Sequence, residues 1–228
     1  MHYLVTGANR GIGLELVRQL LARKQRVTAT ARQPERAEAL QQLLGDFGDA
    51  LRIVTLDVGN DASIAALATT LGSQPLDVLI NNAGVGSNDN LMSFSREQAL
   101  AIYATNAVSP MLVTRALLPA LRAATSAKVV NISSLMGSVA DNTSSGSHAY
   151  RMSKAALNMA TKCLAIDLAR DGVVVAAMHP GWVKTDMGGK RAPIEVEDSA
   201  KGILKVVDGL DAKAAGALID FTGRTLPF

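Results

Sequence analysis

The sequence is poor in several residue types, and each shortage excludes a kind of chemistry. Cys163 is the only cysteine among 228 residues, so an intrachain disulfide and a thiolate metal cluster are both excluded. The three histidines, His2, His148 and His179, lack the spacing of metal ligands, so no metal site is expected. No G-x-S-x-G turn is present either, which leaves Ser-His-Asp hydrolysis without support.

Long apolar runs and clusters of like charge are also missing. No apolar stretch reaches the ~20 residues that cross a bilayer, and the opening "MHYLVTGANRGIG" lacks the basic start and long apolar core of a secretory leader. The 23 basic and 20 acidic residues give a net charge of +3 without any basic run. We therefore expect a cytoplasmic protein that binds neither membrane nor nucleic acid.

Strand-like and helical segments alternate along nearly the whole chain. The hydrophobic share of 48% is enough for one core, and we expect one domain over residues 1–228. The expected strands span 2–6, 26–31, 51–56, 76–81, 127–133, 173–179 and 217–221. The expected helices span 13–23, 34–44, 61–71, 95–123 with breaks near Pro110 and Pro119, a stretch that begins near 148, and 196–207.

Such apolar strands, each followed by a helix, predict a doubly wound α/β fold of the Rossmann type. Its sheet would be parallel and seven-stranded, with helices on both faces. Ligands of this fold bind beyond the carboxyl ends of the strands. The side chains that follow each strand are therefore the first candidates for a site.

A glycine turn, "TGANRGIG" (6–13), joins the first expected strand to the first expected helix. Glycines there let a phosphate approach backbone N–H groups at a helix N-terminus, where the helix dipole favours negative charge. A plain tight turn is the alternative. The position within an α/β chain favours dinucleotide binding.

The end of the second strand indicates which dinucleotide. NAD sites place a carboxylate there for the ribose 2′-OH, but this strand ends "TATAR", with Ala31 at the carboxylate position and Arg32 next. Arg10 lies within the glycine turn. Two guanidiniums and no carboxylate suit the 2′-phosphate of NADP(H), because arginine binds phosphate through bidentate, charge-assisted hydrogen bonds. The alternative is that both arginines are simply solvated.

Two further strand ends carry candidate residues. Asp57 directly follows the third strand and can accept a hydrogen bond from an adenine amino group, although such an Asp is often only a turn former. "NNAG" (81–84) ends the fourth strand, and its Asn side chains can tie neighbouring loops together beneath the adenosine. Taken alone, these asparagines would be ordinary turn residues.

The stretch "SSGSHAYRMSKAALN" (144–158) places Tyr150 and Lys154 on one helix face. When a hydride moves to a carbonyl carbon, the oxygen needs a proton from a nearby acid. A tyrosine can supply it if a neighbouring ammonium stabilises its anion. "NISS" ends the fifth strand, so Ser133 or Ser134 can polarise the substrate oxygen from the same edge of the sheet.

These elements together resemble the short-chain dehydrogenase/reductase family, and the resemblance covers essentially the whole chain. It rests on T-G-x-x-x-G-x-G (6–13), N-N-A-G (81–84), the strand-end serine, Y-x-x-x-K (150–154) and P-G (180–181). The resemblance implies that Tyr150 is the acid/base, that Lys154 lowers its pKa and binds the nicotinamide ribose, and that Ser134 orients the substrate. Asn106, in "YATNAVSP", matches the asparagine that holds a water in the family's proton relay.

The resemblance and the arguments above together give an expected cofactor-binding set. Its members are Gly7, Asn9, Arg10, Gly11, Ile12, Gly13, Arg32, Asp57, Val58, Asn82, Ala83, Gly84, Tyr150, Lys154, Pro180, Gly181, Val183 and Thr185. For Thr185 the alternative is a cap on the short segment that follows. The family further implies a homodimer or homotetramer, and the small, apolar residues after Tyr150 suit close packing against the sheet or a partner helix.

One departure from the family pattern is the interval between Ser134 and Tyr150, which is longer than usual and predicts an enlarged loop over the pocket. "SSLMGSVADNT" and "HPGWVKTDMGG" are similar to the subgroup that contains Sniffer-type carbonyl reductases and C-factor proteins. This likeness implies NADPH-linked interconversion of a small carbonyl (ketone, aldehyde or quinone) and an alcohol. The alternative from another class is an NADP(H)-binding signalling or redox-sensing protein.

Three smaller expectations concern packing. The short region after Gly181 predicts an open pocket, with Trp182 and Met187 either forming an apolar wall or packing on the last helix. Cys163 lies at helical spacing from Met159 and Ile166 and is expected in the core rather than as a reactive thiol. His148 is expected in a loop, with a place in the pocket as the alternative.

Overall fold

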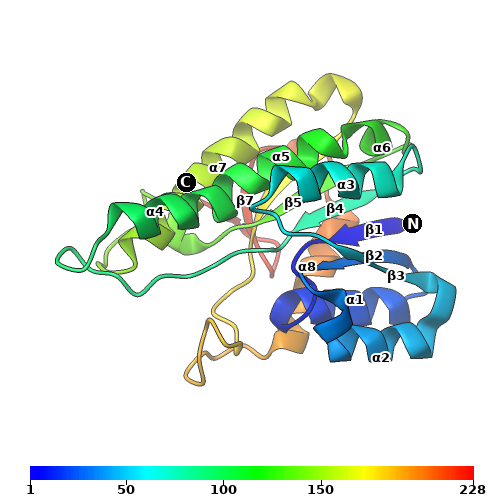
Figure 1. Cartoon of the computed structure of the whole chain (residues 1–228). Coiled ribbons are helices and arrows are strands. Elements are labelled where there is room, and N and C mark those ends of the chain that lie inside the picture. Colours follow the sequence, from blue (N-terminus) through cyan, green and yellow to red (C-terminus); the bar gives the residue numbers. More distant parts are fainter.

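A sheet of eight strands, in the order β3-β2-β1-β4-β5-β6-β7-β8, runs through the middle of the molecule (Figure 1). The computed structural model describes all 228 residues. The strands are β1 (His2–Val5), β2 (Arg26–Ala31), β3 (Leu51–Thr55), β4 (Val78–Asn81), β5 (Lys128–Ile132), β6 (Val174–His179), β7 (Leu218–Asp220) and β8 (Thr225–Leu226). The first seven are parallel, which confirms the predicted doubly wound α/β fold.

The eighth strand is a small correction to the predicted seven. β8 pairs antiparallel with β7 after a tight turn. Within that turn, the carboxylate of Asp220 accepts hydrogen bonds from the N–H groups of Thr222 and Arg224, and Gly223 has a φ of 97°. Because β8 has only two residues, it leaves no alternating pattern in the sequence.

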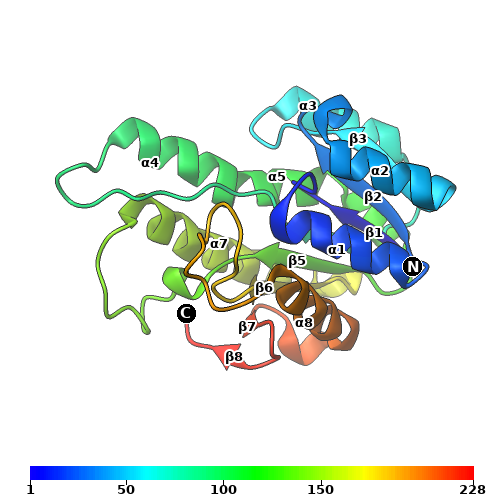
Figure 2. The same ribbon diagram turned by 90° about the horizontal axis from the view of Figure 1, so that it is seen from below.

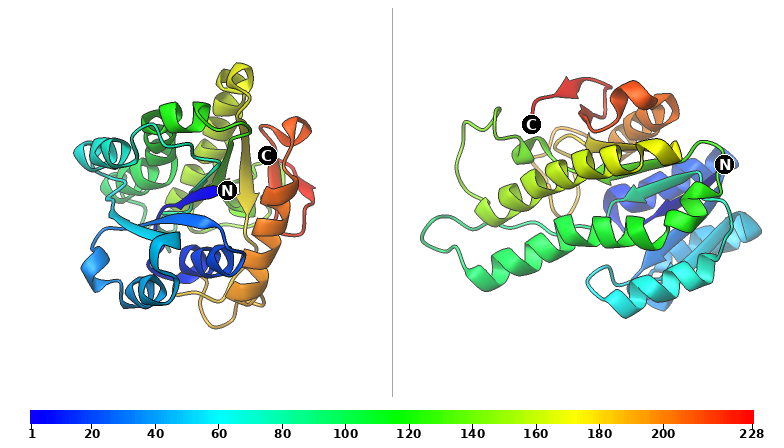
Figure 3. Two further views of the ribbon diagram at one scale, coloured as in Figure 1. Left: turned by 90° about the vertical axis from the view of Figure 1, so that its right-hand side faces the viewer. Right: turned by 90° about the horizontal axis from the view of Figure 1, so that it is seen from above.

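Helices cover both faces of the sheet, as the end-on view in Figure 3 shows. On one face lie α1 (Gly11–Ala22), α2 (Glu38–Phe47) and α8 (Val196–Gly209). On the other lie α3 (Asp61–Leu71), α4 (Arg96–Tyr103), α5 (Ser109–Ala116), α6 (Leu118–Arg122) and α7 (His148–Asp167). None of these helices is long and apolar enough to cross a membrane.

The two layers explain why the strands are mostly apolar. Tyr3 and Val5 of β1 point into a core of 26 buried residues beneath α1, α2 and α8, whereas Leu4 points into a second core of 18 buried residues on the opposite face. Successive side chains of a strand alternate between faces, so a sheet covered on both sides needs apolar residues at every position.

The long helical region predicted over 95–123 is divided into four pieces. α4 continues into a π-helical turn, Ala104–Val108, and then into α5 and α6. Pro110 and Pro119 lie in the first turns of α5 and α6. Backbone N–H groups there have no partner within the helix, so proline's lack of an N–H costs no hydrogen bond. The prolines therefore mark helix starts. The helix predicted over 34–44 is also shifted, because Pro34–Arg36 forms a separate 3-10 turn before α2.

The prediction that Cys163 packs in the core is wrong. Its side chain is exposed, as are Met159 and Ile166. α7 instead turns Leu157, Thr161 and Leu164 toward the sheet. This helix carries apolar residues on two faces. Helical spacing alone does not decide which of the two faces packs against the sheet.

Candidate active site

A cleft of about 1140 Å³ opens at the carboxyl ends of the strands. Figure 2 shows that the segments after β4, β5 and β6 all extend from this end of the sheet, away from the N-terminus. The cleft is lined from the glycine turn and from stretches within 84–98, 133–151 and 179–188. The site therefore lies where the fold predicts ligands to bind.

The structure brings part of the predicted set to the cleft wall. Nine predicted residues line it, namely Arg10, Ile12, Gly84, Ser134, Tyr150, Pro180, Gly181, Val183 and Thr185. Asn106 and Lys154 are buried just behind this wall. The others, Gly7, Asn9, Gly11, Gly13, Arg32, Asp57, Val58, Asn82 and Ala83, do not line it.

The glycine turn packs directly against the N-N-A-G segment. Gly7 has a φ of 64°, and a Cβ there would lie 2.9 Å from the Cα of Ala83. The side chain of Asn82 donates hydrogen bonds to the carbonyl oxygens of Thr6 and Gly7, at 3.0 and 3.1 Å. The predicted role of this asparagine in tying two loops together thus agrees with its contacts.

The surroundings of the glycine turn fit an anionic dinucleotide. Gly11, with a φ of 54°, begins α1, and no acidic residue occupies the first turn of that helix. Arg32 is exposed, and Arg10 pairs with Asp186 at 3.0 Å on the surface. Such exposed ion pairs are weak, so Arg10 is easily released to another anion. The residues present therefore suit a cofactor that carries an additional phosphate.

Tyr150 and Lys154 stand one helical turn apart on α7. The Nζ of Lys154 lies 5.7 Å from the centre of the Tyr150 ring and donates to the carbonyl oxygen of Ile132 at 2.8 Å. Burial lowers the pKa of Lys154 to about 8. Burial raises the pKa of Tyr150, and the neighbouring Ser134 hydroxyl offsets this in part. Tyr150 is therefore a phenol at neutral pH and can donate a proton.

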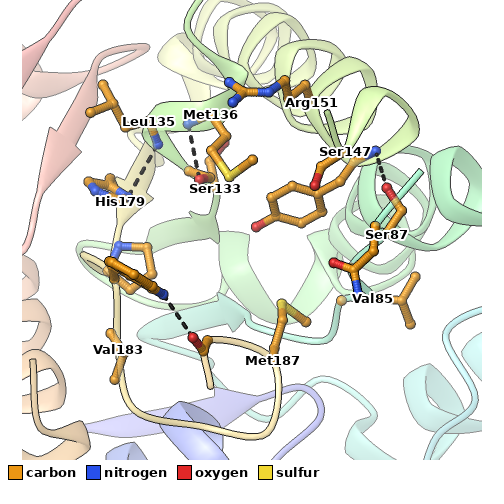
Figure 4. Close-up of a pocket in the computed structure, with 18 of the residues that line it drawn as sticks. Val85, Ser87, Ser133, Leu135, Met136, Ser147, Arg151, His179, Val183 and Met187 are labelled. Atoms are coloured by element: carbon orange, nitrogen blue, oxygen red, sulfur yellow. Dashed lines mark hydrogen bonds between the residues drawn. The ribbon is translucent and has the colours of Figure 1, made fainter. Parts of the chain in front are cut away.

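The two strand-end serines have different surroundings. Ser133 is 1% exposed and its hydroxyl donates to Oδ1 of Asn158 at 2.6 Å. Ser134 lines the cleft together with Tyr150, and its Oγ accepts from the N–H of Met136 at 3.1 Å (Figure 4). The choice of Ser134 as the substrate-orienting serine agrees with this geometry.

Asn106 is fully buried in the π-helical turn. Its Oδ1 accepts from the N–H of Val85, and its Nδ2 donates to the carbonyl oxygen of Val85, both at 2.8 Å. Nδ2 also donates to the Ser153 hydroxyl on α7 at 2.9 Å. The Asn106 side chain thus joins the segment after β4 to the helix that carries Tyr150. The role expected for it in holding a water stays a prediction.

The enlarged loop predicted before Tyr150 borders the cleft. Arg151 fixes it by donating to the carbonyl oxygen of Gly146, to Oδ1 of Asn142 and to the Ser144 hydroxyl. On the opposite side, Met187 and Trp182 line the cleft with more than half of their surface exposed. Of the two readings for this pair, the apolar wall agrees with the structure.

The structure agrees with both alternatives for Thr185, whereas both expectations for His148, a loop residue or a residue in the pocket, are wrong. The hydroxyl of Thr185 accepts from the N–H of Gly188 at 3.1 Å, so it caps the short segment while still lining the cleft. His148 is the first residue of α7 and does not line the cleft.

Sequence reasoning missed several supporting residues. A Cβ on Gly137 would lie 2.6 Å from the carbonyl carbon of Lys154, so glycine is required where this loop crosses α7. His179 accepts from the N–H of Leu135 at 3.2 Å, beside Ser134, and burial lowers its pKa. Ser87 and Asp89 contact the start of α7. No pattern in the sequence marks Gly137 for this contact.

Comparison with known proteins agrees with this geometry. Residues 1–195 match the short chain dehydrogenase family. The C-signal protein of Myxococcus xanthus is 44% identical over 164 residues, which cover 72% of this chain and 99% of that protein.

Two solved structures superpose closely on this chain. An NADPH-bound carbonyl reductase from chicken fatty liver has a TM-score of 0.95 and 39% identity, covering 100% of this chain and 98% of the other. The carbonyl reductase Sniffer of D. melanogaster has a TM-score of 0.95 and 34% identity, covering 100% and 99%. Because the family match covers most of the chain and the two structures superpose over all of it, this protein belongs to the short-chain dehydrogenase/reductase family of oxidoreductases.

Proposed function

We propose that the protein is an NADP(H)-dependent oxidoreductase that interconverts a carbonyl and an alcohol. The observation that carries this proposal is the convergence of Ser134, Tyr150 and Lys154 at one wall of the cleft. The glycine turn, with Arg10 in it, lies on the same edge of the sheet. The solved carbonyl reductase that this chain resembles is bound to NADPH, which supports the choice of cofactor.

The cofactor would be held along the ends of β1 to β6. Backbone N–H groups of the turn that contains Gly11 would bind its pyrophosphate, while Arg10 and Arg32 would bind the 2′-phosphate. Asp57 would accept from the adenine amino group, although its Oδ1 now accepts from the N–H of Gly59 at 3.0 Å. Residues 82–84 and 180–185 would border the adenosine and nicotinamide, and Lys154 would donate to the ribose.

The chain's own residues would handle the proton and the orientation of the substrate. When bound, NADP(H) supplies or accepts the hydride. In the reducing direction, Tyr150 donates its phenolic proton to the substrate oxygen, and the Ser134 hydroxyl holds that oxygen in line. The phenolate that remains is stabilised by Coulomb attraction to the Lys154 ammonium, which is buried and therefore weakly screened by water.

The walls of the cleft indicate a small or planar ketone, aldehyde or quinone. Met136, Trp182 and Met187 supply flexible or flat apolar surface near Tyr150. Residues 87–89 and 141–144 make the opposite rim polar. The half-exposed apolar side chains leave the cleft open to solvent, so the substrate need not be buried completely.

Assembly as a homodimer or homotetramer is part of the same proposal. Met152, Met159 and Ile166 are each more than half exposed along the outer side of α7. The neighbouring helix α4 adds Leu100 and Tyr103, 61% and 46% exposed. Two adjacent helices with exposed apolar side chains form a surface suited to a second copy of the chain.

A second candidate is a signalling protein whose partner surface responds to NADP(H). The likeness to the C-signal protein of M. xanthus favours it. The complete set of Asn106, Ser134, Tyr150 and Lys154 favours turnover, because a protein that only binds does not need an acid/base pair.

The deciding experiment measures NADPH and NADH oxidation with a panel of ketones, aldehydes and quinones, for wild type and Tyr150→Phe. We expect turnover with NADPH that falls by roughly 100-fold or more in the variant, since a positioned general acid contributes about 10²–10⁴-fold. The Kd for NADPH should stay within about threefold, because the phenol proton is not needed for binding. Tight NADPH binding without Tyr150-dependent turnover would favour the signalling protein.

A further inference from the structure

The N-terminus of α7 is capped by a different part of the chain. Ser147, directly before the helix, has a left-handed φ of 51° and its side chain makes no capping hydrogen bond. The segment after β4 fills this role: the N–H of Ser147 donates to the carbonyl oxygen of Asp89 at 2.7 Å, and the N–H of Ala149 donates to Oδ2 of Asp89 at 3.2 Å. The N–H of Tyr150 donates to the Ser87 hydroxyl oxygen at 3.1 Å (Figure 4).

These bonds serve groups that the helix cannot satisfy itself. The first N–H groups of an α-helix have no partner within the helix, and the usual capping side chain is missing here. The Asp89 side chain is 2% exposed. Burial raises the pKa of Asp89, but the polar groups around its carboxylate, among them the Ser87 hydroxyl, the Ala149 N–H and His148, together outweigh this and lower it. A buried carboxylate thus faces the positive end of the helix dipole.

We propose that Ser87 and Asp89 are positioning residues, which fix the first turn of α7 and so set the place of the Tyr150 phenol relative to Ser134. The inference rests on the proposed function, in which Tyr150 is the acid/base. The Ser87 bond acts on the backbone of Tyr150 itself, and the Asp89 bonds act one and three residues before it. A shift of about 1 Å at a reacting group can cost about 100-fold in rate.

The other end of the same segment is also fixed. Asn106 binds both backbone groups of Val85, next to Gly84 of the N-N-A-G motif. Residues 84–90 therefore form a short brace between the proposed cofactor site and the acid/base helix. This stretch forms neither helix nor strand, yet side-chain hydrogen bonds hold it at both ends.

The test compares Asp89→Ala, Asp89→Asn and Ser87→Ala with wild type, Tyr150→Phe and the control Ser95→Ala. Ser95 caps α4 by accepting from the N–H of Gln98 at 3.1 Å and does not line the cleft, so the control loses an equivalent bond elsewhere. We expect Asp89→Ala to lower kcat by about 10- to 100-fold, with KM and the Kd for NADPH within about threefold. Asp89→Asn, whose amide oxygen still accepts, should recover most of kcat.

Ser87→Ala removes one hydroxyl, and we expect kcat to fall by about 3- to 10-fold in a folded protein. Ser95→Ala should keep kcat within about twofold, because its bond lies on another helix. Hydrogen exchange of the amides in 147–151, measured without cofactor, gives a readout independent of turnover. It should accelerate in Asp89→Ala but not in Asp89→Asn or Ser95→Ala.

Three outcomes would overturn the inference. If Tyr150→Phe is inactive and Asp89→Ala keeps the wild-type kcat, the positioning role is wrong while the proposed function stands. If Ser95→Ala lowers kcat as much as Asp89→Ala does, the effect is general loss of stability. If wild type and Tyr150→Phe do not differ in turnover, the proposed function fails and the positioning role fails with it.

Discussion

Lys154 places an ammonium group in a buried position, and this has a measurable stability cost. Burial lowers its pKa from 10.5 to about 8, so between these values the unfolded chain binds more protons than the folded one. The stability of the cofactor-free protein therefore contains a penalty that is full below pH 8 and is relieved as the pH rises toward 10.5. The shift corresponds to about 3 kcal/mol.

We predict that this penalty disappears in Lys154→Met. Between pH 8 and pH 10.5, the free energy of unfolding of wild type should rise by about 3 kcal/mol relative to that of the variant. Only wild type carries the buried ammonium whose deprotonation removes the penalty. Urea denaturation at several pH values measures this difference. A difference that stays constant across the range would show that Lys154 titrates normally in the folded protein.

Arg32 is predicted to select the cofactor. Arg32→Gln should raise the Kd for NADPH by roughly 10- to 100-fold and leave the Kd for NADH nearly unchanged, because only NADPH carries the 2′-phosphate. Titration calorimetry with both dinucleotides measures this. Arg36→Gln is the matched control, since Arg36 is also exposed and its loss changes the net charge by the same amount. Equal weakening of both dinucleotides would argue against a 2′-phosphate contact.

Among single residues, those that belong to spaced motifs could be predicted to lie at the candidate site. Residues that reach the site from a distant part of the sequence could not. Tyr150, Lys154 and Ser134 were predictable because a motif fixes their place at a strand or helix end. Ser87 and Asp89 were not, because about sixty residues separate Asp89 from its partner Ala149. Cys163 was misplaced because α7 has apolar residues on two faces.

The contact between Gly137 and α7 is an element-scale constraint. The loop after β5 crosses α7 so closely that a Cβ at Gly137 would also lie 2.8 Å from the backbone nitrogen of Ala155. The two elements carry Ser134 and Lys154, so their separation sets the width of the site. Any residue larger than glycine must move one of them.

Gly137→Ala is therefore expected to lower both the free energy of unfolding, by about 1–3 kcal/mol, and kcat. The control is Gly45→Ala in α2, where a Cβ meets nothing within 4 Å; it should stabilise by about 0.5–1 kcal/mol because alanine is the better helix former. Urea denaturation and steady-state kinetics on both variants measure these effects. Wild-type kinetics in a folded Gly137→Ala would mean that the contact is not tight.

Element existence was predictable, but element boundaries were less so. The seven main strands all lie within a few residues of their predicted spans, because most of their residues are apolar and buried between the two helix layers. The π-helical turn at 104–108 was not predicted. A π-helical turn differs from an α-helix only in which backbone groups form hydrogen bonds with each other. The local sequence does not indicate this pairing.

For the whole molecule, the exposed side of α7 leads to a prediction about assembly. Wild type should sediment as a dimer or tetramer, whereas Met159→Glu combined with Ile166→Glu should give a folded monomer, because buried unpaired charges are costly. Analytical ultracentrifugation measures the mass. Phe47→Glu, on α2 in the other layer, is the control and should leave assembly unchanged. A monomeric wild type would refute the proposed interface.

The strand order also governs how this chain can reach its folded state. β1 lies between β2 and β4, and its pairing with β4 joins Tyr3 to Val78. The middle of the sheet thus depends on partners about 75 residues apart, and such non-local parallel pairings form slowly. During synthesis, β1 has only one neighbour until β4 has emerged. Its other edge, a row of unpaired backbone N–H and C=O groups between side chains that are buried in the folded protein, stays exposed for that interval and needs protection from aggregation.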